Sequence, residues 1–220
     1  MARNIKIDNS LLKRLRLKVQ NEKRKSESKP PREKYLIVCE GAKTEPNYFK
    51  AIEKRLPKGI IQLNILGIGA NTVSVVKYAI KERDKNIGTL DEYDEVWVVF
   101  DKDDFPDKNF NNAIFLAGNN NIKCAHSNEA FELWYVLHFQ YLDTALTREQ
   151  YFEILTKAFG FKYEKNLETI IEVLNEKGNE ANAINWAEKI DNLSNDINPA
   201  IKKPHTKVYK LLSALKKFEE

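Results

Sequence analysis

Short hydrophobic runs alternate with helix-like segments from residue 35 to residue 139, and this alternation constrains the fold more than any other feature. Tyr35–Cys39 and Val96–Phe100 are hydrophobic at every position, as in strands that are covered on both faces of a parallel sheet. Ile60–Leu66 and Ile122–Ala125 predict two further strands. The pattern predicts an α/β fold of the doubly wound type, with a mostly parallel sheet flanked by helices.

Segments with helical spacing lie between these strands and continue after them. Thr44 can cap the first helix, and Asn71 or Thr72 can cap the second. From residue 147 onward the spacing is helical and no segment is a convincing strand. The predicted helices are Glu45–Leu56, Asn71 or Thr72 to Lys85, Asn109–Asn119, Ser127 or Asn128 to Phe139, Thr147–Phe159, Leu167–Glu176, Glu180–Asn192 and Lys207–Phe218.

Charge is distributed unevenly along the chain. Residues 1–34 hold twelve of the 36 Lys and Arg but only four of the 32 Asp and Glu, so this segment is strongly basic and the remainder slightly acidic. Such an arm can attract a polyanion such as nucleic acid, or it can be a solvated, disordered tail. We therefore divide the sequence into a basic N-terminal arm or linker (1–34), an α/β domain (35–140) and a helical C-terminal region (141–220).

Several classes of protein do not fit this sequence. No hydrophobic run reaches the roughly 20 residues that span a bilayer, and the beginning MARNIKIDNS lacks the apolar stretch of a signal peptide. Cys39 and Cys124 each lie in a predicted buried strand, so we expect core thiols rather than a disulfide. These features predict a soluble, cytoplasmic protein with no membrane partner.

Acidic residues follow two of the predicted strands directly. Glu40 follows the first strand, and Asp101 and Asp103 follow the third. Ligands bind α/β sheets at the carboxyl ends of the strands, and crowded carboxylates there need a cation. Mg²⁺ or Mn²⁺ suits such oxygen ligands, and Gly41 leaves room for a close approach. The alternative is a pair of solvated loops in which Asp103 or Asp104 caps a helix.

The amino-acid sequences of these segments resemble those of known families. A strand that ends in Glu-Gly and a strand that ends in Asp-x-Asp resemble the toprim domain of topoisomerases, primases and overcoming-lysogenization-defect nucleases. The segments Tyr35–Phe49, Val96–Asp104 and Ser127–Phe139, with a weaker match at Pro204–Leu212, are more similar still to the RloB-like family. The resemblance implies a toprim or Rossmann-like fold for residues 35–140. It also implies a Mg²⁺-dependent nuclease linked to bacterial phage-defence and restriction loci.

The resemblance assigns roles to particular residues. Glu40 aligns with the toprim glutamate, which is a metal ligand or a general acid or base. Asp101 and Asp103 align with the Asp-x-Asp metal ligands, and Asp104 is an additional acid that can act as an outer partner. Lys43 is a candidate for contact with the scissile phosphate, with an ordinary surface lysine as the alternative.

The third similar segment adds candidates on one predicted helix. Glu129 and Glu132 are three residues apart, so they occupy neighbouring positions on one helical face. The helix should begin at the edge of the sheet that carries the acids, so either glutamate is a candidate second metal ligand. The alternative is a solvent-facing pair, with Glu129 stabilising the helix start. His138 lies on the same helix and is more often a packed or hydrogen-bonded histidine than a ligand.

A basic cluster near the C-terminus is a candidate nucleic-acid contact. It consists of Lys202, Lys203, His205 and Lys207, and a solvated lysine face is the alternative.

Three functions compete on this sequence. The first is a metal-dependent nuclease that cleaves DNA or RNA as the effector of an anti-phage, abortive-infection system with a partner ATPase. The second is a non-catalytic nucleic-acid-binding or regulatory subunit of such an ATPase complex, although the presence of all three motif acids favours an intact site. Primase-like nucleotidyl transfer is the weakest, because no nucleotide-priming module is recognisable.

Overall fold

The computed structural model describes residues 32–102, 106–193 and 198–219. The chain divides into two units, Met1–Arg32 and Glu33–Glu220, and the second holds every described helix and strand. Most of the predicted basic arm therefore lies outside the described residues. The helices after residue 141 belong to the same compact unit as the sheet.

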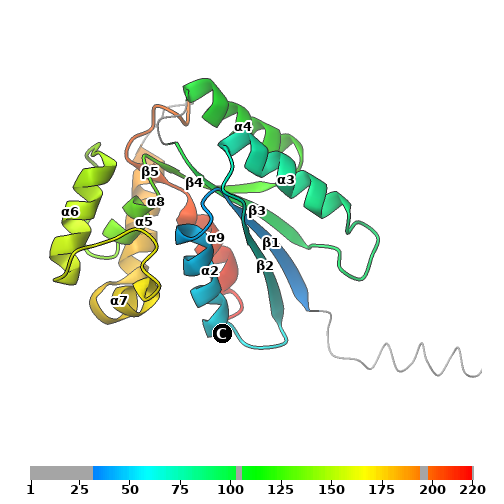
Figure 1. Cartoon of the computed structure of the whole chain (residues 1–220), viewed down its shortest axis with the longest axis horizontal. Helices are drawn as coiled ribbons and strands as arrows, with labels where there is room; N and C mark the ends of the chain where they lie inside the picture. Colours follow the sequence, from blue (N-terminus) through cyan, green and yellow to red (C-terminus); the bar gives the residue numbers. More distant parts are fainter. Residues whose placement is uncertain (1–31, 103–105, 194–197, 220) are drawn as a thin grey trace, which may run out of the picture. The chain divides into compact units, whose positions relative to one another are not determined.

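One five-stranded sheet organises this unit, with the strand order β2-β1-β3-β4-β5 (Figure 1). The first four of these strands run parallel, and β5 pairs antiparallel with β4. This arrangement confirms the predicted α/β class with a mostly parallel sheet. The strands are β1 Glu33–Cys39, β2 Ile61–Gly67, β3 Glu95–Asp101, β4 Lys123–Asn128 and β5 His205–Thr206.

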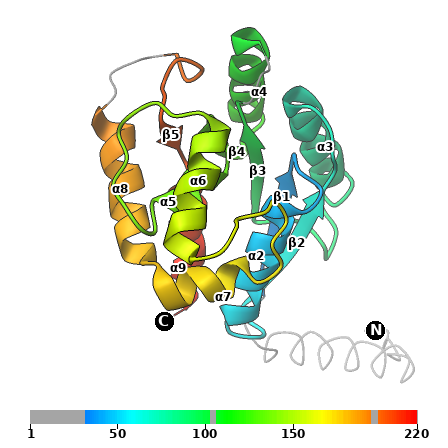
Figure 2. The same ribbon diagram turned by 60° about the vertical axis from the view of Figure 1, so that its left-hand side comes forward.

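Helices cover both faces of the sheet (Figures 1 and 2). One face packs against α3 and α4, and the other against α2, α5 and α9, around which α6, α7 and α8 are arranged. The eight described helices are α2 Thr44–Arg55, α3 Thr72–Asp84, α4 Asp107–Asn119, α5 Glu132–Val136, α6 Arg148–Phe159, α7 Ile170–Lys177, α8 Glu180–Leu193 and α9 Val208–Lys216.

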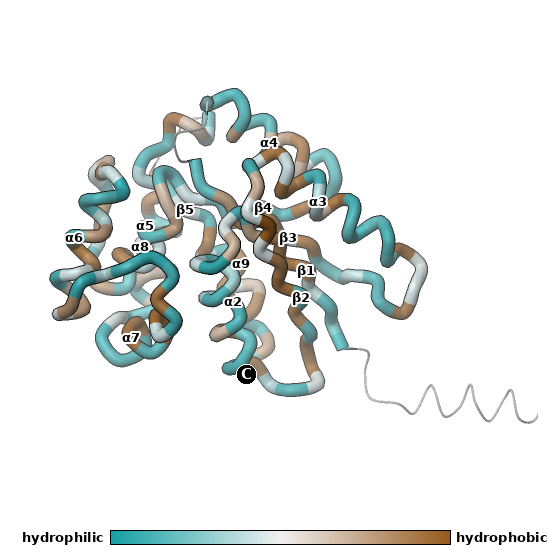
Figure 3. The backbone as a smooth tube through the Cα atoms, in the orientation of Figure 1, coloured by the Kyte–Doolittle hydropathy of each residue, from teal (hydrophilic) through white to brown (hydrophobic). Residues whose placement is uncertain are grey.

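Alternation along the strands explains why the central strands are hydrophobic at every position. In β1, Leu36 and Val38 join the core beneath α3 and α4, whereas Tyr35, Ile37 and Cys39 join the core beneath α2 and α9. All five are fully buried, and Figure 3 shows the central strands as the most hydrophobic part of the trace. A strand that is buried on both faces cannot alternate between polar and apolar residues.

Two predicted helix starts are confirmed and one is wrong. The Asn71 side chain accepts a hydrogen bond from the Ser74 backbone N–H, and Thr147 forms a capping box with Gln150. Thr44, in contrast, is the first residue of α2 rather than its cap. Its hydroxyl donates to Asn166 Oδ1 at 2.9 Å instead, which ties the start of α2 to the connection between α6 and α7.

A short strand was not predicted in the C-terminal region. The two residues of β5 pair with Ser127 and Asn128 of β4, and the Ser127 and Thr206 hydroxyls are hydrogen-bonded at 3.0 Å. This pairing extends β4 to Asn128, so α5 begins only at Glu132. The predicted helix from Ser127 or Asn128 is therefore wrong in its first turn, because Ser127 and Asn128 belong to the sheet and residues 129–131 precede α5.

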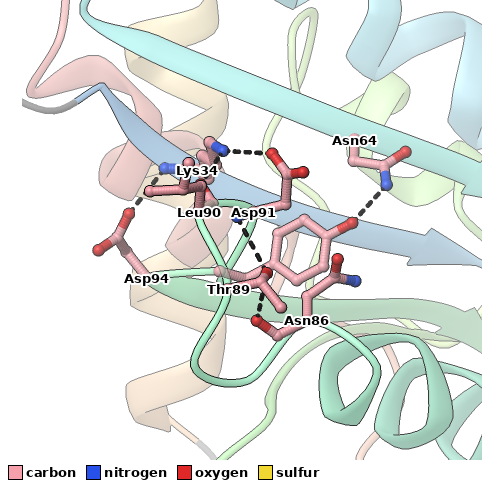
Figure 4. Close-up of polar contacts among 8 residues, drawn as sticks. Lys34, Asn64, Asn86, Thr89, Leu90, Asp91 and Asp94 are labelled. Carbon is pink, nitrogen blue, oxygen red and sulfur yellow. Dashed lines mark hydrogen bonds and ion pairs between the residues drawn. The ribbon is translucent and has the colours of Figure 1, made fainter.

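The amino end of the sheet carries one ion pair and several hydrogen bonds (Figure 4). The Lys34 ammonium lies 2.7 Å from Asp91 Oδ1 and also donates to the Leu90 carbonyl. The Lys34 backbone N–H donates to Asp94 Oδ2 at 2.8 Å, and Asn64 donates to the Tyr93 hydroxyl at 2.6 Å. These bonds hold the connection between α3 and β3 against β1 and β2.

Two further expectations concern thiols and membranes. Cys39 and Cys124 are both free, which confirms that they are not joined in a disulfide. Cys39 is buried, as expected of a core thiol, whereas Cys124 is only half-buried. Among the described helices, none has the length and apolar character needed to cross a bilayer.

Candidate active site

Glu40 stands at the carboxyl end of β1, as the sequence predicts. Its backbone N–H donates to the Val99 carbonyl at 2.8 Å, which continues the pairing of β1 with β3. Its Oε2 accepts a hydrogen bond from the Asp101 backbone N–H at 3.1 Å, and its Oε1 accepts one from the Thr72 hydroxyl at 3.3 Å. The predicted convergence of Glu40 and Asp101 on one edge of the sheet is therefore present.

Asp101 is the last residue of β3, and its carboxylate faces other acids. Burial raises the pKa of Asp101 well above its ordinary value, and the carboxylates of Glu45 and Glu132 raise it further. A hydrogen bond from the Phe131 backbone opposes this shift in part. Asp101 Oδ1 is buried and has no hydrogen-bond partner among the described residues. A buried carboxylate oxygen without a partner destabilises the folded state unless a cation or a proton neutralises its charge.

Glu45 is a site residue that the sequence reasoning missed. It is the second residue of α2 and only 6% exposed. Burial raises its pKa and Glu132 adds to the rise, whereas backbone N–H groups at the helix start and Lys165 lower it. Gly41 lies directly against this side chain, because a Cβ at position 41 would overlap the Glu45 carboxylate as it is placed here.

Glu132 is the first residue of α5 and is 1% exposed. The Tyr163 hydroxyl donates to Glu132 Oε1 at 3.2 Å. Burial raises the pKa of Tyr163, and the charge of Glu132 raises it further, so Tyr163 remains a protonated donor. The helix thus brings Glu132 to the edge that carries Asp101, as predicted for one of the two glutamates.

Glu45, Asp101 and Glu132 line one pocket of about 280 Å³, which we call the Asp101 pocket, whereas Glu40 is not part of its lining. Two lysines, Lys43 and Lys165, share the lining with the acids. Lys165 and Asn166 belong to the connection between α6 and α7, so the helical C-terminal region completes a pocket at the carboxyl edge of the sheet. The lining residues are Gly41, Ala42, Lys43, Thr44, Glu45, Asp101, Phe131, Glu132, Lys165 and Asn166.

The predicted metal ligands are only partly described. Asp103 and Asp104 lie outside the described residues, so their part in the site stays a prediction. Among residues 32–102, 106–193 and 198–219, no three Asp, Glu, His or Cys side chains form a ready-made ligand set. Mg²⁺ commonly binds through one or two carboxylates, with water and substrate phosphate completing its shell. The unpartnered Asp101 oxygen and the crowded acids fit that mode of binding.

Comparison with family models assigns the chain to a protein family. A family model described as RloB-like protein matches residues 35–215, which include every strand except the first two residues of β1. The chain belongs to the RloB-like family. Searches of curated proteins and of solved structures find no significant match. The matched range contains both the sheet and the helices that complete the Asp101 pocket, so the family extends over the whole site.

Glu129 takes a different position in this RloB-like chain from the one predicted. It lies before α5, not on it, because β4 extends to Asn128. Its carboxylate pairs with the Lys203 ammonium, and it does not line the Asp101 pocket. The expectation that Glu129 and Glu132 share one helical face is therefore wrong, and Glu132 alone of the two lines the pocket.

The predicted basic cluster is not a uniform exposed surface. His205 is 1% exposed, and its Nε2 lies 2.7 Å from Asp191 Oδ1. Lys207 is 4.0 Å from the same oxygen, and Lys203 pairs with Glu129. His205 is thus a buried part of β5 and is not presented to nucleic acid. The contribution of Lys202, Lys203 and Lys207 stays a prediction.

His138 is a packed residue, the more common of the two situations considered for it. Its Nδ1 lies 2.9 Å from the Trp134 carbonyl, and its ring packs edge-on against the Trp134 ring with 5.0 Å between centroids. Burial lowers the pKa of His138 to about 4, so the ring is neutral near pH 7. It does not line the Asp101 pocket.

Proposed function

We propose that this RloB-like chain is a metal-dependent nuclease that cleaves phosphodiester bonds in DNA or RNA at the Asp101 pocket. The observation that carries the proposal is the crowding of Glu45, Asp101 and Glu132 in one pocket at the carboxyl ends of parallel strands. Ligands bind α/β sheets at this edge. Like charges that are mutually destabilising without a ligand are a common sign of a functional site.

The residues present fit a hard divalent cation, Mg²⁺ or Mn²⁺. Asp101 supplies an unpartnered buried oxygen, and Glu45 and Glu132 are the other carboxylates that line the pocket. When bound, such a cation would polarise phosphoryl oxygens and help to activate water. The sequence similarity adds Asp103 and Glu40 as candidate ligands. Glu40 also holds the Asp101 backbone N–H, so it positions the end of β3 whether or not it contacts a cation.

The lysines of the Asp101 pocket are suited to bind a phosphate of the substrate. Lys43 and Lys165 line the pocket together with the acids. Each can place an ammonium near a phosphate oxygen. Tyr163 keeps the Glu132 carboxylate oriented by its hydrogen bond. The pocket thus combines acids that can hold a cation with cations that can hold the substrate backbone.

The decisive assay compares cleavage by single variants. Labelled plasmid DNA, single-stranded DNA and tRNA are incubated with the protein and Mg²⁺ or Mn²⁺. Asp101→Asn and Glu45→Gln preserve shape but remove a charge, and we expect each to lower the cleavage rate at least about 100-fold. Glu53→Gln is the matched control, because Glu53 is an exposed acid on the same helix as Glu45. It should cleave at the wild-type rate.

A partner ATPase is part of this proposal, because RloB-like proteins resemble the toprim component of two-gene systems. Each assay is therefore run with and without any ATPase that is encoded beside the gene. Wild-type cleavage that Asp101→Asn matches would show that the Asp101 pocket is not the active centre. Nucleic-acid binding without cleavage under every condition would favour the non-catalytic subunit instead.

A further inference from the structure

The outer edge of β4 is open over half of its length. β4 pairs with β3 from Lys123 to Ser127, but β5 pairs only with its last two residues. Residues Lys123 to Ala125 therefore have no strand partner on the outer side in the part of the chain that is described. α4 flanks this edge on one face of the sheet and α9 on the other, which leaves a recess between the two helices.

This recess is a pocket of about 480 Å³, which we call the β4-edge pocket. Its walls are largely apolar, with Ile114 from α4, Ile122 before β4 and Ala214 from α9. Three lysines also line it, namely Lys207, Lys210 and Lys123, of which Lys123 pairs with Glu95 at 2.8 Å. The volume and the mixture of apolar walls with a few polar groups are those of small-molecule sites. None of the residues of the Asp101 pocket contributes to it.

His126 supplies a buried polar group without a partner in this pocket. It is 2% exposed, and neither of its ring nitrogens has a hydrogen-bond partner among the described residues. Its ring stacks on Phe100 with 5.9 Å between centroids and packs edge-on against Phe110 at 5.3 Å, so the ring is fixed. Burial lowers the pKa of His126 well below its ordinary value, and a neutral ring offers one donor and one acceptor.

Lys207 and Lys210 share one acid among the residues that the structure describes. This acid is Asp191, at 4.0 Å from Lys207 and 3.4 Å from Lys210. The same carboxylate accepts hydrogen bonds from His205 and Tyr209. One carboxylate thus serves two ammonium groups and two further donors. Burial lowers the pKa of Lys207, so an anion bound beside it would relieve an unfavourable charge.

We propose that the β4-edge pocket binds a small organic anion, with the charged group at Lys207 and Lys210 and an apolar body against Ile114, Ile122 and Ala214. His126 would hydrogen-bond a polar atom of the bound molecule. The site is separate from the proposed nuclease centre and does not depend on it. A single anionic head group with an apolar body matches the two lysines at the start of α9 beside the apolar walls of the recess.

Gly118 makes a clean test possible. It lies in α4 and lines the pocket, and a Cβ at this position would meet no atom within 4 Å. Gly118→Leu therefore adds a side chain at the pocket wall, and its Cβ lies in open space. Leucine is also a better helix former than glycine. The variant should fold at least as well as the wild type while its pocket is filled.

Two dyes with the same apolar body serve as probes on the full chain. One is anilinonaphthalene sulfonate, which is anionic, and the other is phenylnaphthylamine, its uncharged counterpart. Fluorescence titration should give one anionic dye per chain. Replacing both lysines, Lys207→Gln with Lys210→Gln, should weaken the anionic dye about tenfold or more. The uncharged dye should change less than about twofold, because it makes no charged contact.

Gly118→Leu should weaken both dyes at least about tenfold, with an unfolding temperature no lower than that of the wild type. Lys50→Gln with Lys54→Gln, two lysines of another surface pocket, should leave both titrations unchanged. The proposal is overturned if Gly118→Leu binds the anionic dye as the wild type does. It is equally overturned if the lysine variants weaken both dyes alike. Thermal unfolding of each variant shows that any loss of binding is not a loss of fold.

Discussion

Asp191 and Asp101 are both carboxylates in mostly enclosed surroundings, but the groups around them are opposite in kind. Among the described residues, Asp191 contacts hydrogen-bond donors and cations, namely His205, Tyr209 and two lysines. Burial alone would raise its pKa, yet these groups hold the pKa of Asp191 far below its ordinary value. Asp101 faces Glu45 and Glu132, and its pKa is raised. One carboxylate stabilises the fold, whereas the other is kept at a cost that a ligand can offset.

The largest effect on stability should come from Asp191→Asn. The substitution removes the charge that His205, Tyr209 and the two lysines share, so we expect a loss of about 2–3 kcal/mol in the free energy of unfolding. Urea unfolding at neutral pH measures it. Glu188→Gln, an exposed acid on the same helix, should change stability by less than about 0.5 kcal/mol. Equal effects of the two substitutions would mean that the Asp191 contacts are not stabilising.

Asp101→Asn should have the opposite sign. With a chelator present, removal of one of three crowded charges should stabilise the protein by about 1 kcal/mol. The same urea experiment measures it. In excess Mg²⁺ the wild type should instead be more stable than Asp101→Asn, because a cation that binds the native state stabilises the wild type but not the variant. A destabilised Asp101→Asn protein in chelator would contradict the raised pKa of Asp101.

The two acids also predict opposite dependences on pH. The folded pKa of Asp191 is depressed, so its contribution is complete above about pH 4 and is lost as the pH falls below that value. The pKa of Asp101 is raised in the folded state, so ionisation of Asp101 destabilises the fold. This destabilisation is absent below about pH 4 and grows as the pH rises. The free energies of unfolding of both variants should therefore approach that of the wild type on acidification. Asp191→Asn starts less stable than the wild type, and Asp101→Asn starts more stable. Unfolding curves across the acidic range in chelator test this directly.

The regions that the sequence did and did not predict differ for a physical reason. β1 and β3 were predictable because burial on both faces leaves only hydrophobic residues, and their ends place Glu40 and Asp101 together. β5 was missed because its two residues are strand only through their pairing with β4. His205 consequently entered a basic cluster, although it is buried against Asp191. Nothing in the local sequence links these two residues, which are fourteen positions apart.

The missed parts of the Asp101 pocket follow the same rule. Glu45 has the spacing of an ordinary residue in the first turn of a helix, and only the tertiary structure shows it to be buried. A second glutamate five residues after Glu40, in the same similar segment, was the available signal. Tyr163 and Lys165 come from the connection between α6 and α7, far along the chain. Contacts of this kind have no periodicity, so no sequence pattern indicates them.

Tyr163→Phe should give the smallest effect. It removes the hydroxyl that donates to Glu132, so we expect a loss of about 0.5–1 kcal/mol in unfolding free energy. Affinity for Mn²⁺ should fall by about tenfold, because Glu132 loses the bond that orients it. Tyr141→Phe is a matched control at a half-buried tyrosine away from the pocket. If Tyr163→Phe binds Mn²⁺ as that control does, Glu132 does not need its hydrogen bond.

Direct Mn²⁺ binding tests the central claim, that the Asp101 pocket is a divalent-cation site. Electron paramagnetic resonance of free Mn²⁺ during titration with protein gives the affinity without nucleic acid or ATPase, so it does not depend on catalysis. We predict that wild-type protein and Glu53→Gln bind Mn²⁺ alike, and that Asp101→Asn binds at least about tenfold more weakly. Thermal unfolding of the three proteins confirms that each is folded. Equal Mn²⁺ affinity in wild type and Asp101→Asn would contradict the claim.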